Sequence, residues 1–313
     1  MRLVFWGTSS FAVPSLRALL GEGFDVVGVV TQPDRAVGRS RSTLVPSPVK
    51  SVALEEEIPL YQPETPKDES FLAQLRALEP GLSIVVSYGH ILSSSLIDLP
   101  SFGTINVHAS LLPALRGAAP IQGAVRAGLA ETGVTVMRMV PALDAGPILL
   151  QARTSVARDE TAGELEARLS ELGALALVEA LTLMSLGKLT ETPQDDSKAT
   201  SAPKILREMA RIDWSESAEA VGRHVRAYDP KPGAFTTHRG GEIKLFGAVV
   251  TDATAHHAHA PGTVVSIDAS GMLIACGTRY VLITCAQPAG RKRIDPETWM
   301  RGRGIEVGER FGG

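Results

Sequence analysis

Residues 3–30 read L-V-F-W-G-T-S-S-F-A-V-P-S-L-R-A-L-L-G-E-G-F-D-V-V-G-V-V. The segment opens with a short apolar run that ends at Gly7, and a second apolar run covers Val26–Val30. Between the two runs, Pro14 stands near the start of a helical pattern and Gly21 at its end, as is typical of helix boundaries. This segment therefore predicts a strand, a helix and a second strand in succession.

The same alternation continues through the first half of the chain. Further apolar runs occupy Leu82–Val86, Thr104–Val107 and Val134–Val140, and further helical patterns occupy Pro48–Glu57 and Asp68–Leu78. Because these apolar runs are continuous rather than alternating, we expect strands that are buried on both faces. Alternation of such strands with helices predicts an α/β domain with a doubly wound, mostly parallel sheet.

A long helix is expected to close this first domain. Thr161 and Glu164 have the spacing of a capping box, which places the start of the helix there. The helix is predicted to run to about Gly187 and to pack on the sheet. Its buried face is expected to carry the leucines Leu165, Leu169, Leu172 and Leu175.

The composition changes at Thr190–Pro203, which is polar and has few groups to bury. One helical pattern, Glu216–Ala227, follows, and after it short strand candidates are separated by Gly, Asp and Ser turns, as in a small antiparallel barrel. These candidates are Ala234–Thr237, Glu242–Val250, Gly262–Ile267, Met272–Ala275 and Tyr280–Ala286. We therefore expect an α/β domain at 1–189, a linker at 190–205 and a C-terminal, OB-like β-barrel at 206–313.

With 313 residues, of which 44% are hydrophobic, the chain is long enough for about two domains of roughly 150 residues each. The net charge of -3 argues against a polybasic protein but leaves room for a local basic patch. No window approaches the roughly 20 apolar residues that span a bilayer, and Met1–Gly7 lacks the features of a signal peptide. With only two cysteines, Cys276 and Cys285, these features predict a cytoplasmic protein.

The turn after the first strand, Gly7–Ala12, argues against a nicotinamide enzyme. It reads G-T-S-S-F-A and lacks the G-x-G-x-x-G glycines that let a backbone approach a pyrophosphate. No Walker A lysine follows it either. Dinucleotide-dependent oxidoreductases are therefore disfavoured.

Two polar residues, Asn106 and His108, stand two apart at the end of a buried strand. Residues at this spacing point to the same side of a strand, and the carboxyl ends of parallel strands are where open α/β sheets build their sites. The alternative is a pair of hydrogen-bonded polar groups at a strand end. Asp144 follows the next strand and is either a third site residue or simply the hydrogen-bonding residue of a turn.

Several motifs together resemble the formyltetrahydrofolate-dependent formyltransferases. They are N-V-H-A-S-L-L-P at 106–113, R-G-A-A-P-I-Q at 116–122, and Asp144. Further matching segments are T-Q-P-D-R at 31–35, G-R at 38–39, P-S-P-V-K at 46–50, A-P-K-I at 202–205, A-R-I-D-W at 210–214 and Q-P-A-G at 287–290. The resemblance covers nearly the whole chain, and its later segments are similar to those of the tRNA-directed member of the family.

The resemblance implies that Asn106, His108 and Asp144 are the catalytic residues. In such a reaction an amine attacks a formyl carbon and negative charge develops on the formyl oxygen, which a positioned amide or imidazole can stabilise. His108 and Asp144 suit the proton transfers that accompany the attack. We expect neither a metal ion nor a covalent enzyme intermediate.

The resemblance also implies 10-formyltetrahydrofolate as co-substrate. Ser110, Leu111, Leu112 and Pro113 are expected to contribute to its pocket, since a flat pterin needs a mostly apolar slot with a few polar groups. A second wall is expected from Tyr88, Gly89 and Ile91. Simple core packing is the alternative for each of these three residues.

The expected partner is initiator methionyl-tRNA, whose methionine would receive the formyl group for initiation of translation. Arg35, Arg39 and Arg41 lie in a long loop that resembles the insertion that inspects the acceptor end of the tRNA. Arg291, Lys292 and Arg293 form a second basic cluster that could follow phosphates. We expect no membrane association and no obligate protein partner. The alternative function is formyl transfer to a sugar nucleotide or another small amine.

Overall fold

The computed structural model describes residues 1–37, 43–251 and 259–312. It divides into two compact units. Unit 1 comprises Met1–Gly117, Glu131–Thr154 and Glu166–Ser201, and unit 2 comprises Ala118–Ala130, Ser155–Leu165 and Ala202–Gly313. Two short segments from before residue 166 thus pack within unit 2. The domain boundaries predicted at residues 189 and 206 separate parts of the chain that are expected to fold independently. These boundaries stay a prediction.

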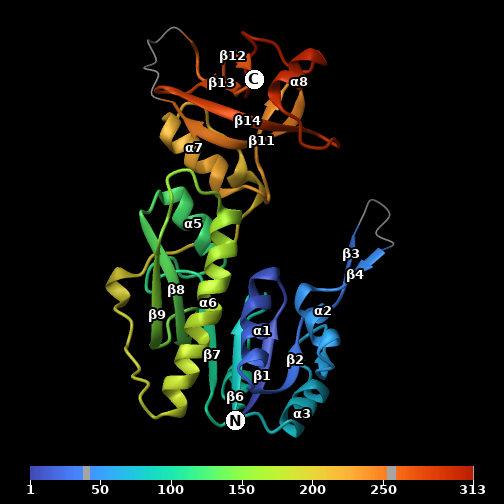
Figure 1. The fold of residues 1–313 in the computed structure, drawn as a ribbon, viewed down its shortest axis with the longest axis vertical. Helices are drawn as coiled ribbons and strands as arrows, with labels where there is room; N and C mark the ends of the chain where they lie inside the picture. The colour runs from blue at the N-terminus through green and yellow to red at the C-terminus, as the bar shows by residue number, and fades with distance from the viewer. Residues whose placement is uncertain (38–42, 252–258, 313) are drawn as a thin grey trace. The chain divides into compact units, whose positions relative to one another are not determined.

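Unit 1 is built on a seven-stranded sheet in the order β5-β2-β1-β6-β7-β8-β9 (Figure 1). Its strands are β1 (Arg2–Gly7), β2 (Asp25–Val30), β5 (Leu60–Tyr61), β6 (Leu82–Val86), β7 (Thr104–His108), β8 (Glu131–Arg138) and β9 (Ile148–Ser155). The strands from β5 to β7 pair in parallel, whereas β8 pairs antiparallel to β7. The predicted mostly parallel sheet is confirmed.

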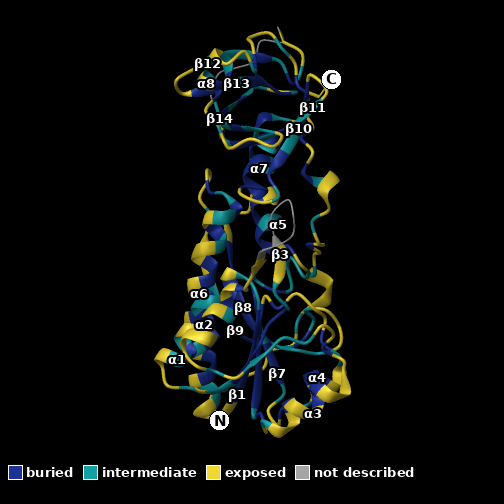
Figure 2. Cartoon of the chain, turned by 90° about the vertical axis from the view of Figure 1, so that its right-hand side faces the viewer, coloured by how far each residue is buried: buried dark blue, intermediate teal, exposed yellow. Residues whose placement is uncertain are grey.

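Helices cover both faces of this sheet. They are α1 (Val13–Gly21), α2 (Pro48–Glu55), α3 (Glu69–Ala77), α4 (Ser94–Ile97) and α6 (Ala162–Ser185). Figure 2 shows α1, α2 and α6 on one side of the buried strands and α3 and α4 on the other. On the α3 and α4 side, the ring of Trp6 packs edge-on against Phe71 and Tyr88. The predicted doubly wound arrangement is therefore confirmed.

The capping box that opens α6 is confirmed. Thr161 Oγ1 accepts a hydrogen bond from Glu164 N at 3.2 Å, and Glu164 Oε2 accepts one from Thr161 N at 2.9 Å. The predicted leucine face is only partly right, because Leu165 is fully buried but Leu175 is 69% exposed. The buried face advances by four residues a turn, through Leu165, Leu169, Gly173, Leu177 and Leu181.

Gly173 sets the contact between α6 and the strand β7. A Cβ atom added at Gly173 would lie 3.1 Å from Val107 Cγ1 and 3.9 Å from Val134 Cγ1. The missing side chain therefore lets the helix lie close to the sheet beside the strand that ends at His108.

Several elements of unit 1 were not predicted. They are the short antiparallel pair β3 (Arg35–Val37) and β4 (Thr43–Val45), the strands β5 and β9, the helix α4, and the 3-10 turns at Ser10–Ala12 and Asp196–Lys198. The polar network at the base of the β3–β4 pair links Asp34, Lys50 and Gln62, with Lys50 Nζ 2.7 Å from Asp34 Oδ2. The Lys50 and Gln62 hydrogen bonds lower the pKa of Asp34 below its ordinary value.

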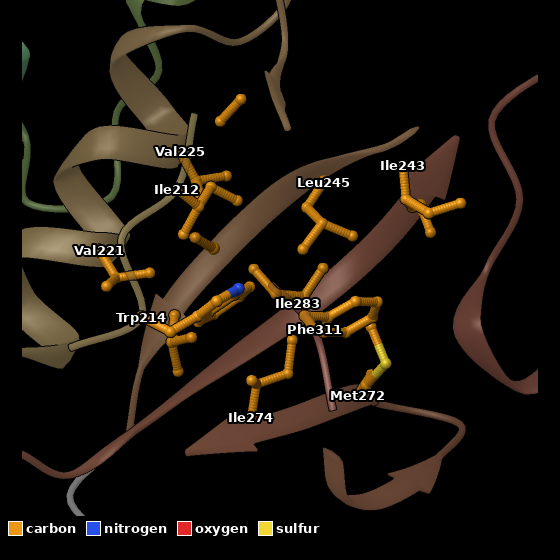
Figure 3. Close-up of a cluster of buried hydrophobic side chains, with 14 of the residues drawn as sticks. Ile212, Trp214, Val221, Val225, Ile243, Leu245, Met272, Ile274, Ile283 and Phe311 are labelled. Atoms are coloured by element: carbon orange, nitrogen blue, oxygen red, sulfur yellow. The ribbon is translucent and has the colours of Figure 1, made fainter. Parts of the chain in front are cut away.

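Unit 2 contains a five-stranded antiparallel sheet in the order β10-β11-β14-β13-β12. Its strands are β10 (Ala234–His238), β11 (Gly241–Val250), β12 (Val264–Asp268), β13 (Gly271–Ala275) and β14 (Tyr280–Pro288). Figure 3 shows its core, where Trp214 and Phe311 lie among aliphatic side chains of the sheet and of α7 (Ala218–Ala227). The two rings stack at 5.9 Å between centroids. The predicted antiparallel β-domain is confirmed.

Three further elements of unit 2 were not predicted. They are α5 (Pro120–Ala127), α8 (Pro296–Arg301) and a 3-10 turn at Arg207–Ala210. α5 packs against α7, and it ends at Gly128, whose φ of 67° is a left-handed conformation that favours glycine. The Arg223 side chain of α7 lies against Gly128, which places a cation at the carboxyl end of α5. No described helix of either unit is long and apolar enough to cross a membrane.

We predict that Gly173→Leu lowers the free energy of unfolding by about 1–3 kcal/mol, because the new side chain overpacks the contact with Val107. Gly21→Leu is the control, since a Cβ at Gly21 meets nothing within 4 Å. Urea unfolding of both variants measures the difference. Equal stability of the two variants would show that α6 does not depend on a close approach at Gly173.

Candidate active site

The centre of the candidate site is the pair His108 and Asp144. His108 ends β7 and is 6% exposed. Its Nε2 lies 3.0 Å from the carbonyl oxygen of Leu115, and because a carbonyl only accepts, Nε2 carries the hydrogen. Its Nδ1 faces Asp144 Oδ2 at 3.8 Å. This is an ion-pair distance, longer than a direct hydrogen bond, so it allows a charge contact or a bridging water.

Asp144 reaches His108 by a route that the sequence did not predict. β8 is antiparallel to β7, so its end at Arg138 lies opposite Ile105, near the start of β7. The loop after β8 must therefore fold back along β7 before its carboxylate can approach His108. The prediction that the turn after this strand supplies a third site residue stays a prediction about catalysis, but the structure does bring the two side chains together.

The backbone around Asp144 is tightly constrained. Asp144 has a φ of 50°, a left-handed conformation that non-glycine residues adopt only with support. Its Oδ2 accepts a hydrogen bond from Gly117 N at 2.9 Å. A Cβ atom at Gly146 would lie 1.8 Å from the Arg138 carbonyl oxygen, so only glycine fits there. The carboxylate is thus held from two sides, by its own loop and by the loop that follows β7.

Asn106 lies two residues before His108 on β7. It pairs with Val85 of β6 and Met137 of β8, and it is half-buried. The strand period places its amide on the same side of the sheet as the His108 imidazole. An uncharged amide donor and an imidazole therefore follow one another on one side of the sheet.

The loop Ser110–Pro113 is held by one buried hydroxyl. Thr135 Oγ1 donates to the Ser110 carbonyl oxygen at 2.7 Å and accepts from Leu112 N at 3.1 Å. Gln151 Nε2 donates to Thr135 Oγ1 at 3.0 Å and to the Leu112 carbonyl oxygen at 2.9 Å. Ser110 and Leu112 are buried, whereas Leu111 and Pro113 are half-buried, so the latter two are the members of this loop that reach the surface.

The second predicted folate wall lies where the order of the strands reverses. β1 has β2 on one side and β6 on the other, so the carboxyl ends of β1 and β6 form the switch point where open α/β sheets bind ligands. Thr8 Oγ1 donates to the Tyr88 carbonyl oxygen at 2.8 Å, which joins the two ends. Gly89 follows with a φ of 92°, and Ile91 is 77% exposed.

The Tyr88 ring is buried in the core, 2% exposed, and burial raises the pKa of its phenol to about 12. Tyr88 therefore presents backbone rather than its ring at the switch point, and only Gly89 and Ile91 of this predicted wall are exposed. Folate contact by these residues stays a prediction. Among the described residues, no group of three or more His, Cys, Asp or Glu side chains is placed to hold a metal ion.

The predicted tRNA-binding residues fall into two groups. Arg35 is exposed and donates to Gln32 Oε1 at 2.5 Å, whereas Arg39 and Arg41 lie outside the described residues. Arg291 and Lys292 are exposed. Arg293 is also exposed, but its guanidinium is held within unit 2, 3.5 Å from the Phe246 ring centroid and 3.0 Å from Asp229 Oδ1.

Sequence reasoning missed the residues that support the site, because none carries chemistry itself. Gly117 lies within the quoted R-G-A-A-P-I-Q motif, and that was its only signal. Thr135 and Gln151 stand in strands, where a buried threonine and a glutamine have no distinctive spacing. Gln194 stands in the polar stretch that was interpreted as a linker, yet its side chain contacts the Asp144 loop.

The site thus combines an amide donor, an imidazole whose second nitrogen faces a carboxylate, and a buried loop at the end of the same strand. Comparison with known proteins shows the family. A family model described as formyl transferase matches residues 1–181, and one described as formyl transferase, C-terminal domain, matches residues 204–304. The chain therefore belongs to the formyl transferase family.

Within that family, the chain is similar to methionyl-tRNA formyltransferases over nearly its whole length. The chain is 44% identical over 312 residues to that of Moorella thermoacetica, covering 100% of this chain and 99% of the relative. It is 45% identical to that of Marinobacter nauticus, covering 93% of each chain.

Solved structures with low identity share the fold. Methionyl-tRNA formyltransferase from Clostridium thermocellum matches with a TM-score of 0.58 and 16% identity, covering 81% of this chain and 95% of that one. HypX from Aquifex aeolicus in complex with tetrahydrofolic acid matches with a TM-score of 0.67 and 19% identity, covering 98% of this chain but 48% of the longer HypX chain.

We predict that Thr135→Val lowers the free energy of unfolding by about 1–3 kcal/mol, because it leaves buried hydrogen-bonding groups of the Ser110–Pro113 loop without a partner. Thr182→Val, at an exposed position of α6, is the matched control and should stay within about 0.5 kcal/mol of wild type. Urea unfolding measures both. A Thr135 variant as stable as the control would mean that the loop is not held by this hydroxyl.

Proposed function

We propose that this chain transfers the formyl group of 10-formyltetrahydrofolate to the amino group of methionine on initiator methionyl-tRNA. The observation that carries the proposal is the approach of Asp144 Oδ2 to His108 Nδ1 within 3.8 Å, in a chain whose relatives over its full length are methionyl-tRNA formyltransferases. Formyl transfer to a sugar nucleotide would use the same chemistry, but it would not explain full-length similarity to tRNA-directed enzymes. We place the activity in the cytoplasm, with translation initiation.

The residues of the site supply what the transfer needs. When bound, 10-formyltetrahydrofolate supplies the carbon that the methionine amine attacks. The Asn106 amide has no charge to lose, so it can donate to the formyl oxygen throughout the reaction. His108 keeps its Nε2 hydrogen on the Leu115 carbonyl, which leaves Nδ1 as the nitrogen that takes a proton from the amine.

Asp144 has two roles in this proposal. Its carboxylate stabilises the positive charge that His108 gains when Nδ1 takes a proton. It also keeps the imidazole paired with a negative charge, because Gly117 N holds Oδ2 on the side that faces His108 Nδ1. The amine loses one proton and the departing folate nitrogen gains one, so the pair needs to move protons without a net change.

The co-substrate fits the switch point and the loop beside it. Gly89, whose φ of 92° and exposure bring backbone to the surface, and the exposed Ile91 offer polar and apolar contacts for a flat ring. We propose that Leu111 and Pro113 contact the folate directly. Ser110 and Leu112 would shape the pocket from within the protein, and Tyr88 would act through its backbone.

The tRNA contacts are proposed from charge. Arg35 is exposed in β3, and Arg291 and Lys292 are exposed on unit 2, whereas Arg39 and Arg41 are proposed from sequence alone because they lie outside the described residues. When exposed cationic side chains bind phosphates, they displace the counterions held by the nucleic acid. The affinity for tRNA then depends steeply on the salt concentration. Arg293 would contribute by fixing the cluster rather than by contact, because Phe246 and Asp229 already hold it.

One assay tests the function. The protein is incubated with 10-formyltetrahydrofolate and, separately, charged initiator methionyl-tRNA, charged elongator methionyl-tRNA and an amino-sugar nucleotide, and the formylated product is identified by mass spectrometry. Formyl-methionine on the initiator tRNA is the expected result. Formylation of the sugar nucleotide alone would replace the proposal with its alternative, and no product with any acceptor would reject a formyl-transfer role.

We predict that His108→Ala, Asp144→Ala and Asn106→Ala each lower kcat by about 10²-fold or more with the fold retained. Their combined losses should be less than additive, because the three groups act on one transition state. Steady-state turnover and circular dichroism check activity and fold. A variant with near-normal turnover removes that residue from the mechanism.

We predict that the double variant Arg291→Ala, Lys292→Ala lowers the slope of log affinity for methionyl-tRNA against log salt by about two units. Arg293→Ala is the contrasting variant. It should leave that slope unchanged and destabilise unit 2 by about 1 kcal/mol, since it loses its contact with the Phe246 ring. Filter binding over a salt series separates the two, and an unchanged slope in the double variant would exclude this cluster from the tRNA surface.

A further inference from the structure

The side chain of Gln194 uses all four of its hydrogen-bonding positions on the candidate site. Its Nε2 donates to the carbonyl oxygens of Asp144 and Gly146, each at 2.8 Å. Its Oε1 accepts from Arg116 Nε at 3.1 Å and from Arg116 Nη2 at 2.7 Å. In the reverse orientation, the amide nitrogen would face the Arg116 donors and the amide oxygen would face the two carbonyl oxygens. These partners therefore fix the orientation of the Gln194 amide.

Gln194 thus joins the two loops that set the catalytic pair. Asp144 and Gly146 belong to the loop after β8, and Arg116 directly precedes Gly117, whose N–H holds the Asp144 carboxylate. The Gln194 amide therefore holds the Asp144 backbone, while the loop that contains Arg116 and Gly117 holds the Asp144 side chain.

The chain around Gln194 is fastened at both ends, which keeps its side chain in place. Thr192 exchanges two backbone hydrogen bonds with Ile148, at 2.8 and 2.9 Å. Further along, the Thr200 carbonyl oxygen accepts from Arg116 N at 2.8 Å, and Thr200 Oγ1 accepts from Leu115 N at 2.8 Å. The segment expected to be a linker with few groups to bury is hydrogen-bonded to both site loops.

Asp144 needs such support, because two features of its loop resist the observed geometry. The loop has to return along β7 from the opposite end of that strand, and Asp144 itself has a φ of 50°. A backbone in that conformation persists only where its surroundings determine it. Within the described part of the chain, Gln194 Nε2 is the only side-chain nitrogen that donates to the carbonyl oxygens of Asp144 and Gly146.

We propose that Gln194 is a positioning residue that holds Asp144 at its working distance from His108. The proposal rests on the formyl transfer proposed above. Gln194 touches neither reacting group, so it acts only through the position of the Asp144 loop. The competing interpretation is that Gln194 serves Arg116 alone and that the site does not depend on its amide N–H groups.

Two single variants separate these interpretations. Gln194→Met keeps the length of the side chain but loses all four hydrogen bonds. Gln194→Glu keeps an acceptor for Arg116 but sets a second oxygen against the Asp144 and Gly146 carbonyls. We expect both to lower kcat by about 10- to 100-fold, as for a displaced catalytic group, with KM for each substrate within about threefold of wild type. If Gln194 served only Arg116, Gln194→Glu would keep normal turnover.

The double variant Gln194→Met, Asp144→Ala gives the sharpest test. If Gln194 acts through Asp144, then adding Gln194→Met to Asp144→Ala changes kcat by less than about twofold. Asp195→Asn, at the adjacent position whose side chain is 51% exposed, is the control and should match wild type. Thermal unfolding of each variant verifies that the fold is retained.

The outcomes are distinct. Absence of turnover by the wild-type protein rejects the proposed function, whereas an active wild type with unchanged Gln194 variants rejects only the positioning role. Additive losses in the double variant would also overturn it. A crystal structure of Gln194→Met tests the role without turnover, since we expect Asp144 to be displaced from His108 by about 1 Å or more. An undisplaced Asp144 in that structure would reject the proposal.

Discussion

The structure of the site depends on one constraint: a carboxylate must reach an imidazole from the opposite end of the neighbouring strands. His108 stands at the carboxyl end of β7, whereas the antiparallel β8 delivers the chain to the other end of that strand. The 3.8 Å separation between His108 Nδ1 and Asp144 Oδ2 therefore requires a loop that folds back and is held there. Gly146 lets the loop pass Arg138, Gly117 binds the carboxylate, and Gln194 binds the backbone.

Much of the fold could be predicted from sequence because its signals are local. The apolar run Leu82–Val86 coincides with β6, and the capping box at Thr161 and Glu164 starts α6 as expected. Other elements were missed because no local signal distinguishes them, as with β9 and with α5, whose first residues carried the family motif. The prediction for Leu175 was wrong because the two successive three-residue steps from Leu169 each fall short of a full helical turn of 3.6 residues, so the side chain rotates away from the buried face.

Part of the candidate site could likewise be predicted from sequence, and part could not. The placement of Asn106 and His108 on one side of β7 follows from the two-residue period of a strand, so spacing alone could predict it. The approach of Asp144 could not be predicted, because it depends on the pairing direction of β8, which is a long-range property. Gln194 was hidden for another reason: a glutamine in a polar stretch looks the same whether it is solvated or hydrogen-bonded on four sides.

The Thr135 hydroxyl has a consequence for how this sequence can evolve. Its single hydrogen and both of its lone pairs are engaged, by Ser110, Leu112 and Gln151, and its methyl group shares a site with no exposure to solvent. Serine alone offers the same donor and acceptors, and it would leave the methyl volume empty. A change at 135 to a residue without a hydroxyl therefore leaves one N–H of Gln151 without a partner, so the two positions are expected to covary across relatives rather than change separately.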